Sequence, residues 1–197
     1  MRPLTDLCKL AIKYSSDRGG RHNTYNHAPC HGTHEYTPTY FAMFSHQRLR
    51  VRSVLEIGIN KGCGLRMWRE FFPNAIITGL DIDHACLLNE ERIQSFVCDQ
   101  GDAHALGNVL QKAQAHPFDI IIDDGSHNMM DQVASLNVLA PLLTDIGIYV
   151  IEDIPRDHTW LDYLLKHTPE CLHPGVIYPP LGTGEMWPEA LYIATKE

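Results

Sequence analysis

The most constraining feature of this chain is a regular alternation of short apolar runs with helical patterns, which begins near Ser53. Apolar runs bounded by turn residues are typical of buried strands, and their alternation with helices predicts repeated βα units. The expected strands span residues 53–58, 75–80, 93–98, 118–122, 147–152, 175–178 and 190–195, and the expected helices span residues 65–72, 85–92, 103–113, 130–143 and 159–167. This order predicts a doubly wound, mainly parallel, seven-stranded α/β sheet.

The first 50 residues do not follow this pattern. Residues 4–14 have the spacing of an amphipathic helix, whereas residues 15–38 are rich in Gly, His, Asn, Thr and Tyr, which indicates a loop outside the core. We therefore expect an N-terminal helix and a segment rich in His and Tyr over residues 1–50, followed by one core domain over residues 51–197.

The composition of the chain indicates which classes of partner it does not bind. The formal net charge of -8 disfavours broad electrostatic binding to nucleic acid, because neutralising phosphates requires a basic surface. We find no run of 18 apolar residues that would predict a membrane span, and the N-terminus has no apolar signal segment. The six cysteines are scattered, which suits reduced thiols. We therefore expect a cytoplasmic protein that binds neither nucleic acid nor membranes.

The ends of the first three strands carry a candidate ligand site, because ligands of an open α/β sheet bind beyond the carboxyl ends of its strands. Glu56, Gly58 and Gly62 belong to a glycine-rich turn that does not fit the G-x-G-x-x-G fingerprint of nicotinamide enzymes. Asp81 follows the second strand, where a carboxylate could accept hydrogen bonds from both hydroxyls of a ribose. The third strand runs into Asp99-Gln100-Gly101-Asp102, which we expect beside an adenine ring; a plain polar turn is the alternative.

The ends of the next two strands carry a cluster of carboxylates. The fourth strand runs into Asp123-Asp124-Gly125-Ser126-His127, and the fifth runs into Glu152-Asp153. If the two strands are neighbours, Asp124, Glu152 and Asp153 converge, and without a cation they would raise one another's pKa. The cluster therefore predicts a hard divalent cation, and Mg²⁺ suits these oxygen ligands. The alternative is that the carboxylates cap separate loops and helices.

His127 follows Asp124 by three residues. Imidazole exchanges protons near neutral pH, so a histidine beside a metal ligand could take the proton of an acceptor hydroxyl. The alternative is an exposed loop histidine that caps the helix beginning near Asn128.

These motifs resemble the metal-dependent sugar O-methyltransferases of macrolide biosynthesis, of the mycinamicin and macrocin type, over roughly residues 52–155. The resemblance implies a Rossmann-like class I methyltransferase fold with S-adenosylmethionine (SAM) as cofactor. It further implies that Asp124, Glu152 and Asp153 hold Mg²⁺ and that His127 is the catalytic general base. The implied cofactor-binding residues are Glu56, Gly58, Asn60, Gly62, Asp81, Ile82, Asp99, Gln100, Asp102 and Asp123.

Two segments before the core look like a pattern found in many relatives of this group. They are Ser16-Asp17-Arg18-Gly19 and His34-Glu35-Tyr36-Thr37-x-x-Tyr40. The resemblance implies that Asp17, His34, Tyr36 and Tyr40 belong to a lid that faces the substrate. The larger macrolide enzymes carry an additional N-terminal domain, and residues 20–34 have no counterpart in the pattern. The acceptor and the oligomeric state therefore do not carry over.

We expect a magnesium-dependent O-methyltransferase that acts on a hydroxyl group of a sugar or another small-molecule acceptor, from a natural product or a polysaccharide. The alternatives are a methyltransferase for a catechol-like chelating molecule and a catalytically silent SAM-binding module.

Two further features of the sequence have alternative interpretations. His27, Cys30, His31 and His34 invite a zinc site, but their spacing lacks the paired ligands of short zinc modules, which favours a solvated or substrate-facing loop. Met186 and Trp187 could form an oligomer contact, which allows a homo-oligomer. Covering the edge of the sheet is the more usual role of such residues.

Overall fold

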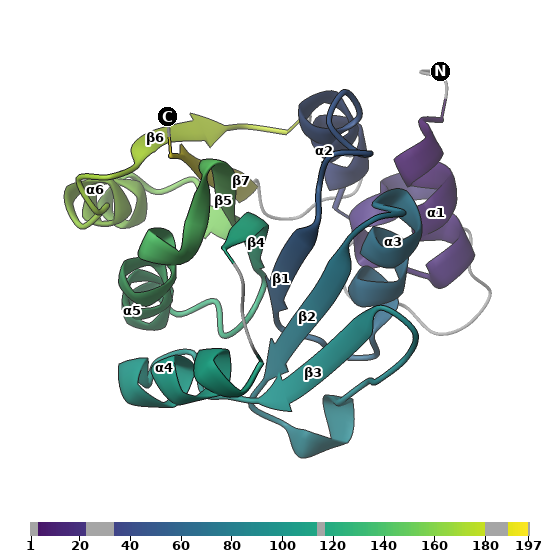
Figure 1. The fold of residues 1–197 in the computed structure, drawn as a ribbon. Helices are drawn as coiled ribbons and strands as arrows, with labels where there is room; N and C mark the ends of the chain where they lie inside the picture. Colours follow the sequence, from purple (N-terminus) through teal and green to yellow (C-terminus); the bar gives the residue numbers. More distant parts are fainter. Residues whose placement is uncertain (1–3, 23–33, 114–116, 180–188, 197) are drawn as a thin grey trace.

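The computed structural model describes residues 4–22, 34–113, 117–179 and 189–196, and it contains one seven-stranded sheet (Figure 1). The strands are β1 (Ser53–Ile57), β2 (Ile76–Asp81), β3 (Ile93–Val97), β4 (Phe118–Asp123), β5 (Leu143–Pro155), β6 (His173–Ile177) and β7 (Glu189–Thr195). They lie in the order β3-β2-β1-β4-β5-β7-β6. β7 runs antiparallel to both of its neighbours, β5 and β6, and the other neighbouring pairs are parallel, so the predicted doubly wound and mainly parallel sheet is confirmed.

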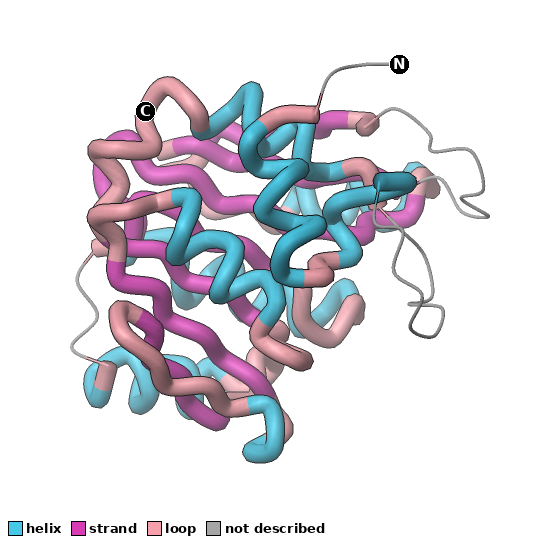
Figure 2. Tube along the Cα trace, turned by 90° about the vertical axis from the view of Figure 1, so that its right-hand side faces the viewer, coloured by secondary structure: helices cyan, strands magenta, loops and turns pink. Residues whose placement is uncertain are grey.

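Helices cover both faces of the sheet. The α-helices are α1 (Asp6–Tyr14), α2 (Tyr36–Phe44), α3 (Cys63–Phe71), α4 (Ala103–Lys112), α5 (Met129–Leu139) and α6 (His158–Lys166), with short 3-10 helices η1 (Asp17–His22), η2 (His84–Cys86) and η3 (Ala140–Leu142). Helices α1, α2 and α3 pack on one face, and Figure 2 views the molecule from their side, with the strands behind them. Helices α4, α5 and α6 pack on the other face. Among the described residues, no helix is both long and apolar enough to cross a bilayer.

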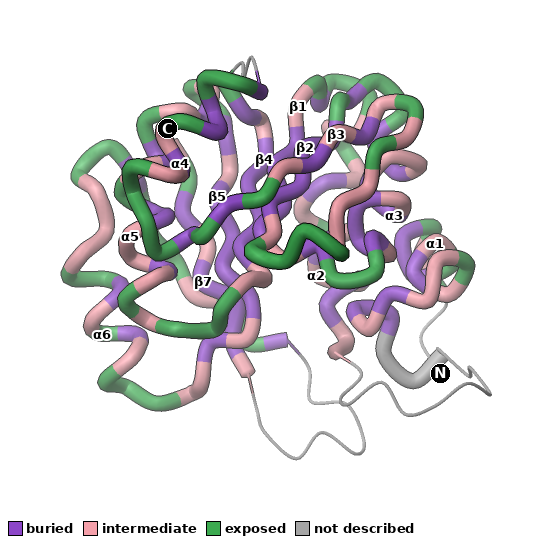
Figure 3. The backbone as a smooth tube through the Cα atoms, turned by 90° about the horizontal axis from the view of Figure 1, so that it is seen from below, coloured by how far each residue is buried: buried purple, intermediate pink, exposed green. Residues whose placement is uncertain are grey.

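Two apolar clusters, one on each face, form the core. The first contains Leu55 and Ile121 of the sheet with Leu136 of α5, and the second contains Val54 and Ile120 of the sheet with side chains of α1 to α3. Alternate residues of β1 and β4 thus serve opposite faces, as the two-residue period of a strand requires. Figure 3 shows the result as buried strands between helices with exposed outer turns.

Two expected helices differ from the structure. Residues 85–92 contain only the end of the short turn η2, an irregular stretch and a turn at residues 91–92. The backbone N–H of Leu88 donates to Ser95 Oγ, and that of Ser95 donates to Asn89 Oδ1. These side-chain hydrogen bonds replace the helical ones. The helix expected over residues 130–143 ends at Leu139, because η3 follows with Pro141 in its first turn and Leu143 already pairs in β5.

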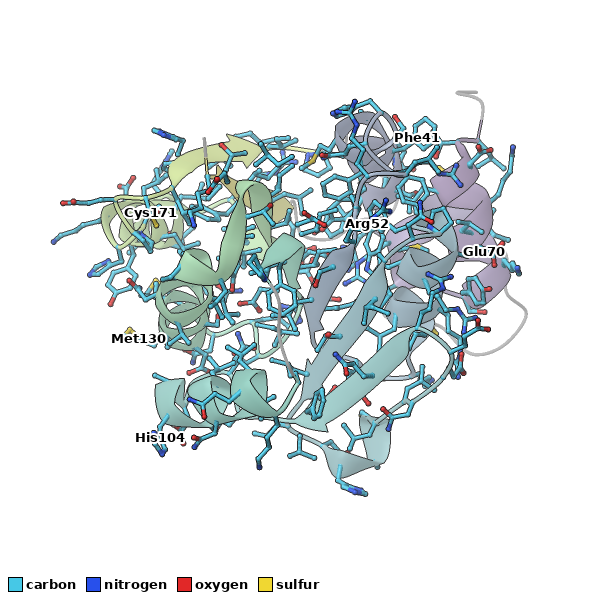
Figure 4. The ribbon with its side chains drawn as sticks, in the orientation of Figure 1. Phe41, Arg52, Glu70, His104, Met130 and Cys171 are labelled. Carbon is cyan, nitrogen blue, oxygen red and sulfur yellow. The ribbon has the colours of Figure 1, made fainter. Side chains whose placement is uncertain are left out.

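The loop expected over residues 15–38 is also corrected. Residues 36–44 form α2, whose Tyr36, Tyr40 and Phe44 are buried and lie on one helix face at a spacing of four residues. The Tyr40 ring stacks on Phe44 at 5.6 Å and meets Trp68 of α3 edge-on at 5.3 Å. In Figure 4, Phe41 of α2 is labelled beside α3, where its ring lies 6.2 Å from Phe71. This part of the N-terminal segment therefore belongs to the core.

Candidate functional site

A cavity of about 470 Å³ lies beyond the carboxyl ends of β1 to β4. The sheet order reverses between β1 and β4, which is where open α/β sheets bind their ligands. The volume suits a small-molecule ligand. The lining residues are Ile57, Gly58, Asp81, Ile82, Cys98, Asp99, Gln100, Gly101, Asp102, Gly125, Ser126 and Asp131.

Gly58 and Asp81 shape one wall of this cavity. Gly58 has a φ of 89°, and a Cβ there would lie 2.0 Å from the carbonyl oxygen of Asp124, so no other residue fits. Asp81 Oδ2 accepts hydrogen bonds from the backbone N–H groups of Ile59 (2.8 Å) and Asn60 (3.0 Å), which fixes the carboxylate at the cavity edge. A fixed carboxylate there can accept the hydroxyl groups of a ribose.

Gln100 forms another part of the cavity wall. Its Nε2 donates to both oxygens of Asp123 at 3.0 Å, and its Oε1 accepts the backbone N–H of Ser126 at 2.7 Å. Gly125 permits this approach, because a Cβ at that position would lie 1.9 Å from Gln100 Oε1. The end of β4 is therefore locked to the end of β3 across the cavity.

Six of the predicted cofactor residues line this cavity: Gly58, Asp81, Ile82, Asp99, Gln100 and Asp102. The other four do not. Glu56 and Asp123 are buried behind it, Asn60 contributes its backbone N–H to Asp81, and Gly62 caps α3. Among the lining residues that the sequence prediction missed, Ser126 directly follows the Asp-Gly turn after β4 and could have been found, whereas Asp131 in the first turn of α5 gave no signal.

Next to the cavity, Asp124, His127 and Asp153 place one possible ligand atom each within 4.8 Å of one another. His127 Nε2 lies 3.9 Å from Asp124 Oδ1, and His127 Nδ1 lies 3.9 Å from Asp153 Oδ2. The His127 side chain is 45% exposed, so it can be reached from solvent. The helix cap at this point is Asn128, whose side chain accepts the N–H groups of Met130 and Asp131. His127 is therefore not the cap of α5.

Irregular backbone aims these side chains. Asp153 has a φ of 57°, and the pairing of β5 with β7 shifts register between Ile151 and Ile154. A bulge of this kind redirects side chains. It also explains why β5 continues to Pro155 and does not end at residue 152, as the sequence predicted, since pairing with β7 resumes after the shift. His127 has a φ of 51°, another left-handed conformation that non-glycine residues adopt at a cost.

The structure places Glu152 differently from the other two predicted metal ligands. Both of its oxygens accept from Arg18 Nε, at 2.7 and 2.9 Å, and Oε1 also accepts from the Tyr40 hydroxyl. Arg18 lies in η1, is 3% exposed, and also pairs with Asp124 Oδ2 (2.5 Å) and Glu56 Oε1 (2.9 Å). The Ser-Asp-Arg-Gly motif marked this segment in the sequence, but nothing in it assigned a role to Arg18.

The surroundings of this cluster raise the pKa values of its carboxyl groups. Burial raises the pKa of Asp124 well above its ordinary value against the opposing effect of Arg18, and the charges of Glu152 and Asp153 raise it further. Burial also raises the pKa of Asp153, although His34 and Tyr36 oppose the shift. Burial raises the pKa of Glu56 to about 7 in spite of Arg18. Carboxylates held together in this way are stabilised by a bound cation.

The predicted lid residues meet the same cluster from the N-terminal side. The Tyr36 hydroxyl donates to Asp153 Oδ1 (2.6 Å), and His34 Nδ1 lies 2.8 Å from Glu189 Oε2. Burial lowers the pKa of His34, but the bond to Glu189 and the charge of Asp153 outweigh it and raise the pKa to about 9. His34, Asp153 and Glu189 form a second group whose ligand atoms could hold a metal ion. Asp17 lies next to Arg18 in η1.

Several residues weighed from the sequence lie outside the described residues. These are His27, Cys30 and His31 of the zinc hypothesis and Met186 and Trp187 of the possible oligomer contact. The five described cysteines, Cys8, Cys63, Cys86, Cys98 and Cys171, are not in disulfide bonds.

No protein-family model matches the chain, but several curated proteins do. Demethylmacrocin O-methyltransferase of Streptomyces fradiae is 41% identical over 156 residues, which cover 76% of this chain and 36% of that protein. The 8-demethyl-8-alpha-L-rhamnosyl tetracenomycin-C 2'-O-methyltransferase of Streptomyces olivaceus is 32% identical over 164 residues, which cover 80% of this chain and 40% of that protein. The chain thus spans well under half the length of these curated relatives.

A solved structure is also similar to this chain. MycE methyltransferase from the mycinamycin biosynthetic pathway, in complex with Mg, SAH and mycinamycin VI, superposes with a TM-score of 0.66 at 34% sequence identity. The match covers 83% of this chain and 42% of MycE.

Proposed function

The chain has the Rossmann-like class I methyltransferase fold and is related to the macrolide and tetracenomycin sugar O-methyltransferases, and we propose that it methylates a hydroxyl group of a small-molecule acceptor. The observation that carries the proposal is the position of the cavity directly beside the Asp124, His127 and Asp153 cluster. Gly125 and Ser126 line the cavity and follow Asp124 in the chain, so a methyl donor and an acceptor could meet there.

The cavity is the proposed SAM site. Asp81 would accept the ribose hydroxyls, and the Asp99 to Asp102 turn would lie along the adenine ring. The MycE complex contains SAH, the product that remains when SAM has donated its methyl group. Gly58 lets the backbone of β1 come close to such a ligand, because it has no side chain.

Asp124 and Asp153 would hold a divalent cation, and Mg²⁺ fits them because it prefers carboxylate oxygens and retains open positions for an acceptor. The MycE complex contains Mg. Burial raises the pKa of Asp124 and Asp153, neighbouring carboxylates raise it further, and a bound divalent ion would favour the charged forms of both. Glu152 is the third predicted ligand of the ion, and it is paired with Arg18. A bound Mg²⁺ would lower the pKa of an acceptor hydroxyl and orient it for attack.

His127 would act as the general base. Its imidazole lies between the carboxylates of Asp124 and Asp153 and is open to solvent, so it can accept the proton of an acceptor hydroxyl bound beside them. Methyl transfer is an in-line displacement at carbon, so the walls of the cavity must hold donor and acceptor in line. A sugar or a catechol with two neighbouring hydroxyl groups can present both to one ion, and the rhamnosyl group in the name of the tetracenomycin relative favours a sugar acceptor. A cytoplasmic location stays a prediction.

The test is a methyl-transfer assay read by mass spectrometry. Purified protein is incubated with SAM and either mycinamycin VI, a simple deoxysugar glycoside or catechol, each with Mg²⁺ or with a chelator. We expect a sugar-bearing acceptor to gain one methyl group only with Mg²⁺. His127→Ala should lower the rate by roughly 100- to 10,000-fold, whereas His158→Ala, which removes an exposed histidine of α6, should not.

Three results would oppose the proposal. Turnover of catechol alone would replace the sugar with a catechol-like acceptor. Full turnover with the chelator would remove the cation from the mechanism. Unchanged turnover by His127→Ala would reject its role as base.

A further inference from the structure

Asp153 belongs to two groups of side chains that could each hold a cation. The first group is Asp124, His127 and Asp153, which carries the proposed site, and the second is His34, Asp153 and Glu189. The two oxygens of Asp153 face different groups. Oδ2 lies 3.9 Å from His127 Nδ1, whereas Oδ1 lies 3.8 Å from His34 Nδ1. One carboxylate therefore stands between two candidate positions for an ion.

The hydroxyl group of Tyr36, the first residue of α2, lies in the second group. It donates to Asp153 Oδ1 at 2.6 Å and lies 3.3 Å from Glu189 Oε2. His34 Nδ1 lies 2.8 Å from the same oxygen of Glu189. Oδ1 of Asp153 and Oε2 of Glu189 therefore already have hydrogen-bond partners within the protein. An ion could enter this group only by breaking these contacts, whereas Oδ2 of Asp153 faces the first group.

The packing around Tyr36 fixes the direction from which its hydroxyl meets Asp153. Tyr36 is buried, with 3% of its surface exposed. Its ring stacks on that of His34, with the centroids 5.0 Å apart, and meets Tyr40 edge-on at 6.5 Å. A hydrogen bond from a hydroxyl to a carboxylate is short and strong when it has this geometry. The orientation of the Asp153 carboxylate is therefore coupled to α2.

We propose that Tyr36 is a positioning residue of the metal site: its hydroxyl holds Oδ1 of Asp153 on the side of His34 and so presents Oδ2 to a cation at Asp124. This inference rests on the proposed function, since it takes the cation site at Asp124 and Asp153 as given. Ligating carboxylates are generally held by hydrogen bonds from groups that do not touch the ion. Tyr36 would act in this way, through Asp153.

A hydroxyl group that only stabilised the fold would behave differently. Tyr36→Phe would then lower the free energy of unfolding, because a buried carboxylate loses a donor, and would leave the metal affinity unchanged. If the hydroxyl orients Asp153, its removal frees Oδ1, the carboxylate can turn toward His34, and the metal affinity falls. Groups that hold metal ligands typically contribute roughly 10- to 100-fold to metal affinity.

The test is a titration of Mn²⁺ alone, with free Mn²⁺ followed by electron paramagnetic resonance. The parent, Tyr36→Phe and Tyr14→Phe are compared. Tyr14→Phe is the matched control, because Tyr14 of α1 also donates its hydroxyl to a carboxylate, that of Glu70 in α3, which belongs to neither group. We expect Tyr36→Phe to bind Mn²⁺ roughly 10- to 100-fold more weakly than the parent, and Tyr14→Phe to match the parent.

The outcomes separate the two proposals. A parent that does not bind Mn²⁺ overturns the metal site and this inference with it. A parent that binds while Tyr36→Phe binds equally well or more tightly overturns only the role of Tyr36, as would equal losses in Tyr36→Phe and Tyr14→Phe. SAM titration of the same samples should give equal affinities, because neither tyrosine lines the cavity.

A second measurement covers the case in which Tyr36→Phe does not fold. In the parent with ¹³C-labelled tyrosine, the NMR signals of the Tyr36 ring should broaden at a small fraction of one equivalent of Mn²⁺, and more strongly than those of Tyr14. This is expected because the Tyr36 hydroxyl contacts a proposed ligand of the ion. Tyr36 signals that survive saturation with Mn²⁺ would place the ion elsewhere and overturn the inference.

Discussion

Gly58 stands where β1 meets the cavity, and its role follows from a single missing side chain. Its φ of 89° is a conformation that other residues avoid, and the Asp124 carbonyl occupies the space of a Cβ. The glycine-rich turn was visible in the sequence, but the reason for this particular glycine is the close approach of β4. Sequence spacing alone does not give that distance.

We expect Gly58→Ala to destabilise the fold by at least about 2 kcal/mol and to weaken SAM binding, because it combines a left-handed backbone with a clash. Gly107→Ala in α4 is the matched control: a Cβ there meets no atom within 4 Å. That variant should gain about 0.5–1 kcal/mol, as alanine does over glycine in a helix. Denaturant unfolding measures both. Equal stabilities of the two variants would contradict the account of Gly58.

The burial of Glu56 can be tested through the pH dependence of stability. Its pKa is raised from 4.5 to about 7, mainly by burial, so a bound proton favours the folded state. This stabilisation is complete below pH 4.5 and is lost as the pH rises through 7. Between these limits we expect the parent to lose roughly 3 kcal/mol relative to Glu56→Gln.

Glu90→Gln serves as the control. The contribution of Glu90 to stability should have the opposite pH dependence, because a hydrogen bond from Arg66 lowers the pKa of Glu90. The free energy of unfolding is measured from urea curves across this pH range. Parallel pH profiles for Glu56→Gln and the parent would show that Glu56 ionises normally in the folded protein.

At the scale of elements, the N-terminal helices differ most from the sequence prediction. The amphipathic pattern correctly indicated α1, but the polar composition of the following segment hid α2 and its buried tyrosines. The hydroxyl groups of Tyr36 and Tyr40 can be buried because Asp153 and Glu152 accept their hydrogen bonds. Such pairing depends on strands far along the chain, so local composition does not predict it. The bulge in β5 also could not be predicted from local composition, because it depends on the pairing with β7.

A mutation in α1 tests whether this segment is part of the core. Leu7 is fully buried, and we expect Leu7→Ala to cost about 3 kcal/mol of unfolding free energy. Leu4→Ala, at a residue that is 36% exposed, should change it by only roughly 0.5 kcal/mol. Guanidinium unfolding of both variants gives the comparison. If Leu7→Ala left the main transition unchanged, α1 would be a detachable cover and not part of the core.

At the scale of the whole molecule, the order of the strands brings the site together. The positions of the strand ends could be predicted, because apolar runs and the residues after them are visible in the sequence. The convergence of three carboxylates on Arg18 could not be predicted, because these contacts join η1 to β1, to the residue after β4 and to β5, across most of the chain. The cavity and the acidic cluster are neighbours with separate side chains, so cofactor binding and cation binding should be separable.

Metal removal tests that separation. Protein treated with a chelator should bind SAM as the untreated protein does and should lose methyl transfer, because the residues that line the cavity include neither Asp124 nor Asp153. Adding Mg²⁺ back should restore activity. Loss of SAM binding on chelation would instead mean that the cation takes part in holding the cofactor.

The central claim is that the cavity at the ends of β1 to β4 binds SAM, and calorimetric titration of SAM tests it most directly. The parent is compared with Asp81→Asn, which alters a lining carboxylate, and Asp83→Asn, which alters an exposed carboxylate two residues away that does not line the cavity. We predict saturable binding by the parent and by Asp83→Asn, and binding at least about tenfold weaker by Asp81→Asn, as expected for losing a hydrogen bond to a charged group. No binding by the parent, or equal binding by all three proteins, would contradict the account.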